Sequence, residues 1–211
     1  MAAFAKATAR QAGGPADKTM KWLLLSKSSG ESLAVSMAGI KLGDRLLVVG
    51  CADPILIARL AVKTGLTGRA FAVDEHEKAA TAAAEIAARE GALIETATAP
   101  WAALPVDPDS FDVAIVRDVL PHLTADAQSG CIREVQRVLR PGGRCLLIDG
   151  KGRTGLVAAV RGTSAPSHYA ATGGPVHALA AQGFKAARIL AEREGLLFAE
   201  AIKANPQSSN H

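Results

Sequence analysis

The stretch RLLVVGCADPILIARLAVKTG, residues 45–65, decides the fold. Its first part is a short β-branched run that ends at Gly50, which predicts a buried strand. The second part carries the signals of a helix: Asp53 as N-cap, Pro54 at the first helical position and Gly65 just beyond the last turn. A strand that leads directly into a helix is the unit from which parallel α/β sheets are built.

The same alternation of strand-like and helix-like stretches continues along the chain. Further strands are expected at 69–74, 92–98, 111–118 and 144–149, and further helices at 76–90, 124–140 and 174–182. Two last strands, about 184–192 and 195–203, are joined by a tight turn at Glu194-Gly195, which predicts an antiparallel hairpin. The pattern therefore predicts a doubly wound α/β fold, a mostly parallel sheet covered by helices on both faces.

Composition excludes several classes of protein. With 49% hydrophobic and 21% charged residues, the chain of 211 residues is expected to fold, as one domain with short arms. No apolar run approaches the length of a membrane span, and the aromatic content of 4% argues against a stacking platform for single-stranded nucleic acid. The three cysteines lack paired spacing, so neither a disulfide framework nor a metal site is expected. A reducing, cytoplasmic location is therefore expected.

The net charge of +4 resides in the first thirty residues, and the rest of the chain is neutral. A nucleic-acid footprint on the folded body is therefore not expected. Membrane binding is not expected either, since no apolar run is long enough for a span. The chain divides into a basic arm (1–16), N-terminal helices (17–40), the α/β domain (41–204) and a tail (205–211). Whether the chain forms a homodimer stays open.

Open α/β sheets bind ligands beyond the carboxyl ends of their strands. The residues that follow the predicted strands are therefore the candidate ligand-binding residues. They are Gly50 to Pro54, Asp74-Glu75, Thr98 to Trp101, Arg117-Asp118 and Asp149-Gly150.

These segments resemble a known family. The stretches LLVVGCADP, AFAVDEH, LPVDPDSFDVAIVRDVLPHL, REVQRVLRPGGRCLLID and AAQGFKAARI…LLFAEAIK are similar, in order and spacing, to class I S-adenosylmethionine (SAM)-dependent methyltransferases. The most similar group is methyltransferase type 11, which includes quinone-biosynthesis methyltransferases, and the resemblance covers Ile40 to Lys203. It implies a seven-stranded sheet of order 3-2-1-4-5-7-6, a Rossmann-like fold, SAM as cofactor and methyl transfer to a small-molecule acceptor.

The resemblance implies a glycine-rich turn after the first strand, where the backbone approaches the cofactor. Gly50 matches the first glycine and Cys51 follows it, whereas Ala52 and Pro54 replace the second and third glycines. Val49 replaces an acidic residue that commonly precedes the turn. Two interpretations of the nearby Asp53 remain: a helix cap, or a carboxylate near the ammonium group of the cofactor.

After the second strand, Asp74 matches the acid that accepts both ribose hydroxyls in the family; a cap for the next helix is the alternative. Glu75 is expected beside the adenine. The following TAPW segment has no acid to read the adenine amino group, so that contact either falls to the backbone of Ala99 or is absent. Pro100, in the same segment, is a further candidate cofactor-binding residue. Trp101 either stacks on the adenine or anchors its loop.

The segment after the fourth strand is expected to hold the methionine end of SAM. Arg117 either clamps the cofactor carboxylate or an anionic substrate, or forms an ion pair with Asp118 or Asp126. A general base is required only for acceptors that hold a proton. The catalytic residue stays unknown, and the candidates are His122, Asp118, His168 and Tyr169. The glycine-rich loop from 151 to 175 has little apolar bulk, which disfavours a lid over a lipid-like quinone.

Two other functions remain open. The altered glycine turn and the missing adenine reader would suit a methyltransferase-fold protein that has lost catalysis and acts as a binding or scaffold partner. An NAD-dependent oxidoreductase would require GxGxxG in the first turn, and GCADPI does not supply it.

Overall fold

The computed structural model describes residues 33–150 and 173–205. The expected basic arm, most of the expected N-terminal helices, residues 206–211 of the tail and the segment 151–172 lie outside the described residues. Residues 33–38 are helical, which is the part of the N-terminal helices that the structure describes.

Seven strands form one sheet of order β3-β2-β1-β4-β5-β7-β6. They are β1 (Arg45–Val49), β2 (Arg69–Asp74), β3 (Glu95–Thr98), β4 (Phe111–Arg117), β5 (Leu139–Gly150), β6 (Lys185–Arg193) and β7 (Leu196–Ile202). The first five strands pair in parallel, and β7 runs antiparallel to both β5 and β6. The expected fold class, strand order and terminal hairpin are confirmed.

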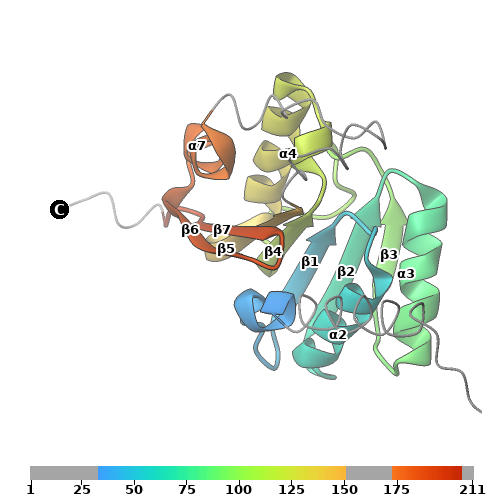
Figure 1. The fold of residues 1–211 in the computed structure, drawn as a ribbon. Helices are drawn as coiled ribbons and strands as arrows, with labels where there is room; N and C mark the ends of the chain where they lie inside the picture. The colour runs from blue at the N-terminus through green and yellow to red at the C-terminus, as the bar shows by residue number, and fades with distance from the viewer. Residues whose placement is uncertain (1–32, 151–172, 206–211) are drawn as a thin grey trace, which may run out of the picture.

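Helices cover both faces of this sheet (Figure 1). They are α2 (Pro54–Thr64), α3 (Glu77–Arg89), α4 (Ala125–Val138) and α7 (Gly174–Ala181), and a 3-10 turn, η1 (Leu120–His122), precedes α4. Side chains alternate along a strand, so Leu47 and Val49 of β1 join the cluster beneath α4 and α7, whereas Leu46 and Val48 pack against α2. Full burial of each such leucine contributes about 1.5–3 kcal/mol to folding.

The start of β5 differs from the prediction. The helix expected to run to residue 140 ends at Val138, and β5 begins at Leu139 rather than at residue 144. Leu139 pairs with Phe111, and the pairing then shifts so that Arg144 faces Val113. Pro141 has no N–H to donate, and Gly142 has a φ of +75°, so the extra residues form an irregular bulge within an extended strand.

An ionic cluster lies at the amino end of the sheet, away from the expected site. The Asp112 carboxylate accepts hydrogen bonds from the side chains of Arg45 and Arg140. Burial alone would raise the pKa of Asp112, but these hydrogen bonds outweigh it and lower the pKa to about 2. Because the folded pKa is depressed from 3.8, this stabilisation is present at neutral pH and is lost progressively as the pH falls from about 4 through about 2.

Candidate active site

The carboxyl ends of β1, β2 and β4 meet at one edge of the sheet. Val49 is the register partner of Val73 in β2 and of Val116 in β4. The residues that come next, Gly50, Asp74 and Arg117, are therefore neighbours although they are far apart in the sequence. The structure thus places the predicted glycine turn, ribose acceptor and arginine together.

Gly50 occupies a position that only glycine fits. Its φ is +97°, and a Cβ there would lie 2.5 Å from the carbonyl oxygen of Arg117 and 2.7 Å from Cγ2 of Val119. Its N–H donates to the carbonyl of Val73 at 2.9 Å. The β1 turn is therefore pressed against the end of β4, and Ala52 at its tip is exposed.

Asp53 caps helix α2, as expected, since its Oδ1 accepts a hydrogen bond from the N–H of Leu56 at 3.2 Å. This confirms the helix-cap interpretation. Pro54 occupies the first helical turn and Gly65 follows the last residue of the helix. A role of Asp53 toward a cofactor ammonium group stays a prediction.

Asp74 is buried, with 6% of its surface exposed. Its Oδ2 accepts a hydrogen bond from the N–H of Cys51 at 2.7 Å, and its Oδ1 accepts one from the N–H of His76 at 2.9 Å, with Nδ1 of the same histidine 3.1 Å away. The carboxylate thus ties the glycine turn to the start of α3. A carboxylate has about four acceptor positions, so one remains for a ligand hydroxyl.

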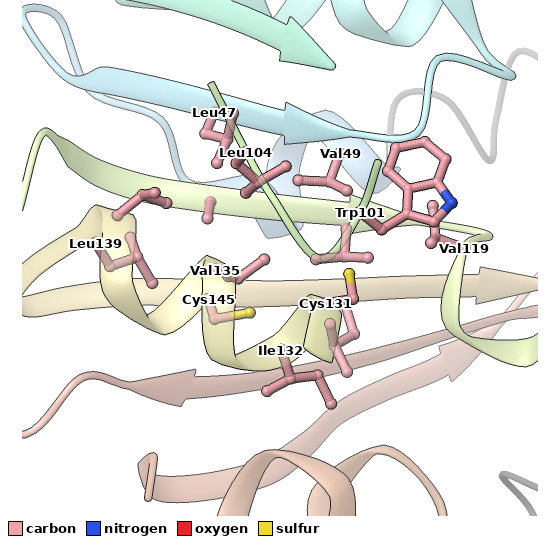
Figure 2. Packing of buried hydrophobic residues seen from close by; sticks show 14 of the residues in the cluster. Leu47, Val49, Trp101, Leu104, Val119, Cys131, Ile132, Val135, Leu139 and Cys145 are labelled. Carbon is pink, nitrogen blue, oxygen red and sulfur yellow. The ribbon is translucent and has the colours of Figure 1, made fainter. Parts of the chain in front are cut away.

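The loop after β3 is held against this edge. The exposed Glu75 accepts a hydrogen bond from the N–H of Trp101 at 3.0 Å. The N–H of Ala99 donates to the carbonyl of Asp74 at 3.1 Å. The indole of Trp101 is 8% exposed and lies in the same buried cluster as Val119 (Figure 2). An indole in the core favours the loop-anchor interpretation of Trp101 over stacking on adenine. Pro100 is exposed at the loop.

Arg117 lies between two carboxylates. Its side chain is 13% exposed; Nη2 is 3.8 Å from Oδ2 of Asp53, and Nε is 3.2 Å from Oδ2 of Asp118. Neither Nε nor Nη1 has a hydrogen-bond acceptor in the part of the chain that the structure describes, although both atoms are buried. The ion pair expected with Asp118 is confirmed, and it is partly buried rather than at the surface.

Asp118 joins the ends of β4 and β5. Its φ is +50°, in the left-handed region that aspartate tolerates better than most residues, and its Oδ1 accepts the N–H of Gly150. With Oδ2 facing Arg117, both oxygens of this candidate base are engaged. Asp118 is therefore better placed to position its neighbours than to take a proton.

Of the remaining candidate bases, His122 lies within the described residues and the other two lie outside them. His122 is exposed at the end of η1, and Gln128 holds that turn by donating to the carbonyls of Leu120 and Leu123. His168 and Tyr169 lie outside the described residues. Within the described ranges no three His, Cys, Asp or Glu side chains gather as a metal site.

The three cysteines are buried thiols. Burial, aided for Cys51 by the charge of Asp74, raises the pKa of Cys51 to about 12; burial, aided by Glu75 and Glu134, raises the pKa of Cys131 to about 12. Burial raises the pKa of Cys145 as well.

We expect all three thiols to resist alkylation in the native protein. At pH 8 a thiol with a pKa near 12 is ionised in only about one molecule in 10,000, and the thiolate is the reactive form. Mass spectrometry after a short treatment with iodoacetamide should find no adduct on native protein and three on denatured protein. Rapid modification of Cys51 in the native state would contradict this placement.

Three comparisons with known proteins bear on this site. The family model described as a methyltransferase domain matches residues 47–147. The 2-phytyl-1,4-naphtoquinone methyltransferase of Trichormus variabilis is 28% identical over 136 residues, which cover 63% of this chain and 58% of that protein. The chain thus spans less than two thirds of the curated relative that it matches.

Solved structures share the architecture. A SAM-dependent methyltransferase from Aquifex aeolicus superposes with a TM-score of 0.67 at 18% identity, covering 82% of this chain and 89% of that one. The cyclase SpnF superposes with a TM-score of 0.59 at 19% identity, covering 82% of this chain and 79% of that one.

The strand order and the turn at Gly50 define a Rossmann-like fold of the methyltransferase class. The methyltransferase-domain model matches from β1 into β5, and the chain is similar in fold to SAM-dependent methyltransferases.

Sequence reasoning missed several contacts at this edge. The hydrogen bond from Cys51 to Asp74 and the approach of Arg117 to Asp53 join residues that are distant in the sequence, and no local pattern signals them. The contact between Asp74 and His76 could have been found, because aspartate often accepts the N–H of the residue two positions later.

Proposed function

We propose that the chain binds SAM at the carboxyl edge of β1, β2 and β4 and transfers its methyl group to a small-molecule acceptor. The observation that carries the proposal is the bond between the N–H of Cys51 and the carboxylate of Asp74. It holds a carboxylate with one acceptor position left beside the Gly50 turn, which packs too closely against the end of β4 to admit a Cβ at Gly50. The free acceptor position suits a nucleoside, because a ribose supplies hydroxyl donors.

The residues along the edge suit different parts of SAM. Asp74 would accept one ribose hydroxyl, and the loop with Ala99 and Pro100, fixed by Glu75, would lie beside the adenine. The backbone at Cys51 and Ala52 would face the centre of the molecule, and Arg117 the amino-acid end.

Bound SAM supplies an electrophilic methyl group on a sulfonium. The task of the chain is then to hold the acceptor nucleophile in line with that group and to exclude water, which can supply much of the rate enhancement. A proton acceptor is needed only where the nucleophile carries a proton. The engaged oxygens of Asp118 leave His122, with His168 and Tyr169, as the residues to test for that step. The acceptor itself is not assigned.

A binding or scaffold role is the second candidate. It is favoured by Asp74, because three of the acceptor positions of its carboxylate already serve the fold. It also agrees with the fold of SpnF, named a cyclase, which indicates that this architecture alone does not fix the reaction.

Calorimetric titration of the purified chain with SAM, S-adenosylhomocysteine and NADH tests the proposal. We expect saturable one-to-one binding of the first two ligands and none of NADH, because the turn lacks the GxGxxG spacing. Absence of binding for SAM and S-adenosylhomocysteine at millimolar concentration would contradict the proposal and favour the scaffold role. Selective binding of NADH would favour an oxidoreductase.

A further inference from the structure

We propose that one face of α4 positions the loop between β3 and β4 and thereby sets the affinity of the chain for the adenosine part of its ligand. The face consists of Gly130, Glu134 and Arg137, which recur at helical spacing and so lie along one side of α4. All three act through the loop, so they are positioning residues rather than catalytic ones. The inference rests on the proposed function, since it assumes that the adenine lies beside the loop at Ala99 and Pro100.

The backbone of this loop takes several of its hydrogen-bond partners from α4. Residues 99–110, all of which the structure describes, lead from the carboxyl end of β3 back to the start of β4 without a helix. Crossovers between parallel strands usually contain a helix, which pairs its own N–H and C=O groups. A crossover without one needs other partners for these groups, and α4 lies beside it.

The side chains of Glu134 and Arg137 bind the middle of the loop. The Glu134 carboxylate accepts a hydrogen bond from the N–H of Leu104 at 2.9 Å. Arg137 donates from Nη2 to the carbonyl of Leu104 at 3.1 Å and from Nη1 to that of Val106 at 3.0 Å. Nε and Nη2 of Arg137 also lie 2.8 Å from the Glu134 carboxylate. This ion pair thus supplies one acceptor and two donors to the backbone of the loop.

The loop also packs directly against α4. A Cβ at Gly130 would lie 3.2 Å from Cβ of Ala102, so the loop passes close to this glycine. Trp101 and Leu104 share a buried cluster with Cys131 of α4 (Figure 2). The position of the loop therefore depends on the surface that α4 presents to it.

The start of the same loop is bonded to the proposed nucleoside site. The N–H of Ala99 donates to the carbonyl of Asp74, and the N–H of Trp101 donates to the carboxylate of Glu75. These bonds join the loop to the end of β2, whereas the bonds to α4 hold the part that follows. A change on the α4 face should therefore alter the surface beside which the adenine would lie.

Two ligands test the role of the ion pair by calorimetric titration. We expect Arg137→Gln to weaken S-adenosylhomocysteine and 5′-methylthioadenosine by a similar factor, about 3- to 30-fold, because both ligands carry the adenosine. Glu134→Gln keeps an acceptor for the N–H of Leu104, so it should lose less affinity than Glu134→Ala. Arg133→Gln, at an exposed arginine of α4, is the matched control and should change neither affinity.

Gly130→Ala separates positioning from stability. Alanine is the better helix former, so the melting temperature should not fall. The added Cβ should push Ala102 and the loop aside and weaken both ligands by about 3-fold. Adding Ala102→Gly removes the opposing methyl group and should restore the affinity. A merely stabilising face predicts no loss of affinity where the melting temperature is kept, so this variant decides the question if Arg137→Gln does not fold.

The fluorescence of Trp101 reports on the loop without any ligand. Trp22→Phe leaves Trp101 as the only tryptophan of the chain. In this background Arg137→Gln should shift the emission to longer wavelength, because the indole becomes more exposed to water, and Arg133→Gln should not. An unchanged emission in Arg137→Gln would show that the loop does not depend on the ion pair.

The outcomes distinguish the two proposals. If the unaltered chain binds both ligands, and folded Arg137→Gln and Gly130→Ala bind them equally well, the positioning role is wrong and the nucleoside site stands. A loss confined to S-adenosylhomocysteine would also overturn the role, because the effect would then lie at the amino-acid end of the ligand. If the unaltered chain binds neither ligand, the proposed function and this inference are both wrong.

Discussion

Gly50→Ala is expected to abolish SAM binding and to lower the free energy of unfolding by about 2–5 kcal/mol. Two costs add. An alanine at a φ of +97° is strained, and its Cβ would lie 2.5 Å from the Arg117 carbonyl and 2.7 Å from Val119. The backbone of β4 must then move away from the turn, which displaces the edge on which the ligand would lie.

Gly91→Ala is the matched control for this substitution. Gly91 has a φ of +73° at the end of α3, but nothing lies within 4 Å of the Cβ that alanine would add. The Gly91→Ala variant should therefore lose about 1–2 kcal/mol of unfolding free energy, through backbone strain alone, and should bind S-adenosylhomocysteine normally. Urea denaturation and calorimetry on both variants measure the difference. Equal losses of stability would show that the close contact at Gly50 is unimportant.

Asp74→Ala is expected to damage both the fold and the ligand site. It leaves the N–H of Cys51 without its acceptor, together with that of His76, and we expect a loss of about 2–4 kcal/mol of stability. If the carboxylate also accepts a ribose hydroxyl, the affinity for SAM should fall by about 10- to 150-fold. Denaturant unfolding and calorimetric titration of the same variant give the two values.

Two further variants separate these effects. Asp74→Asn retains one acceptor oxygen for Cys51, so it should keep more stability than alanine while still losing SAM affinity. His76→Ala removes the imidazole contact at Nδ1 and leaves the carboxylate in place, so it should have little effect on binding. Normal SAM affinity in folded Asp74→Ala would remove Asp74 from the proposed site.

The local features of the fold could be predicted because their signals are local. Asp53 and Pro54 mark the start of α2, and Glu194-Gly195, both at positive φ, form the turn between β6 and β7. The extension of β5 through Pro141 could not be predicted, because proline and glycine usually end an element and only the pairing of Leu139 with Phe111 reveals the strand.

The position of the candidate site on the sheet could be predicted from the sequence, whereas the partners of its side chains could not. Asp74 and Arg117 follow strands whose carboxyl ends meet, so their proximity follows from the topology. Their partners depend on tertiary packing: Asp74 accepts from Cys51, and Arg117 approaches Asp53. The burial of Trp101 has the same origin, since a sequence does not tell whether a loop aromatic faces the core or the ligand.

The hydrogen bond from the N–H of Gly150 to Asp118 fixes the point at which the next segment leaves the sheet, and this affects how such a protein can diversify. The family resemblance implies that acceptor choice varies in the segment that follows Gly150, and Gly150 itself is fixed to the end of β4. Insertions, deletions and exchanges in that segment would therefore leave Arg117 and the Gly50 turn where they are. Selection could then change the acceptor through this segment alone, while the carboxyl edge of β1, β2 and β4, where we propose that SAM binds, is inherited unchanged.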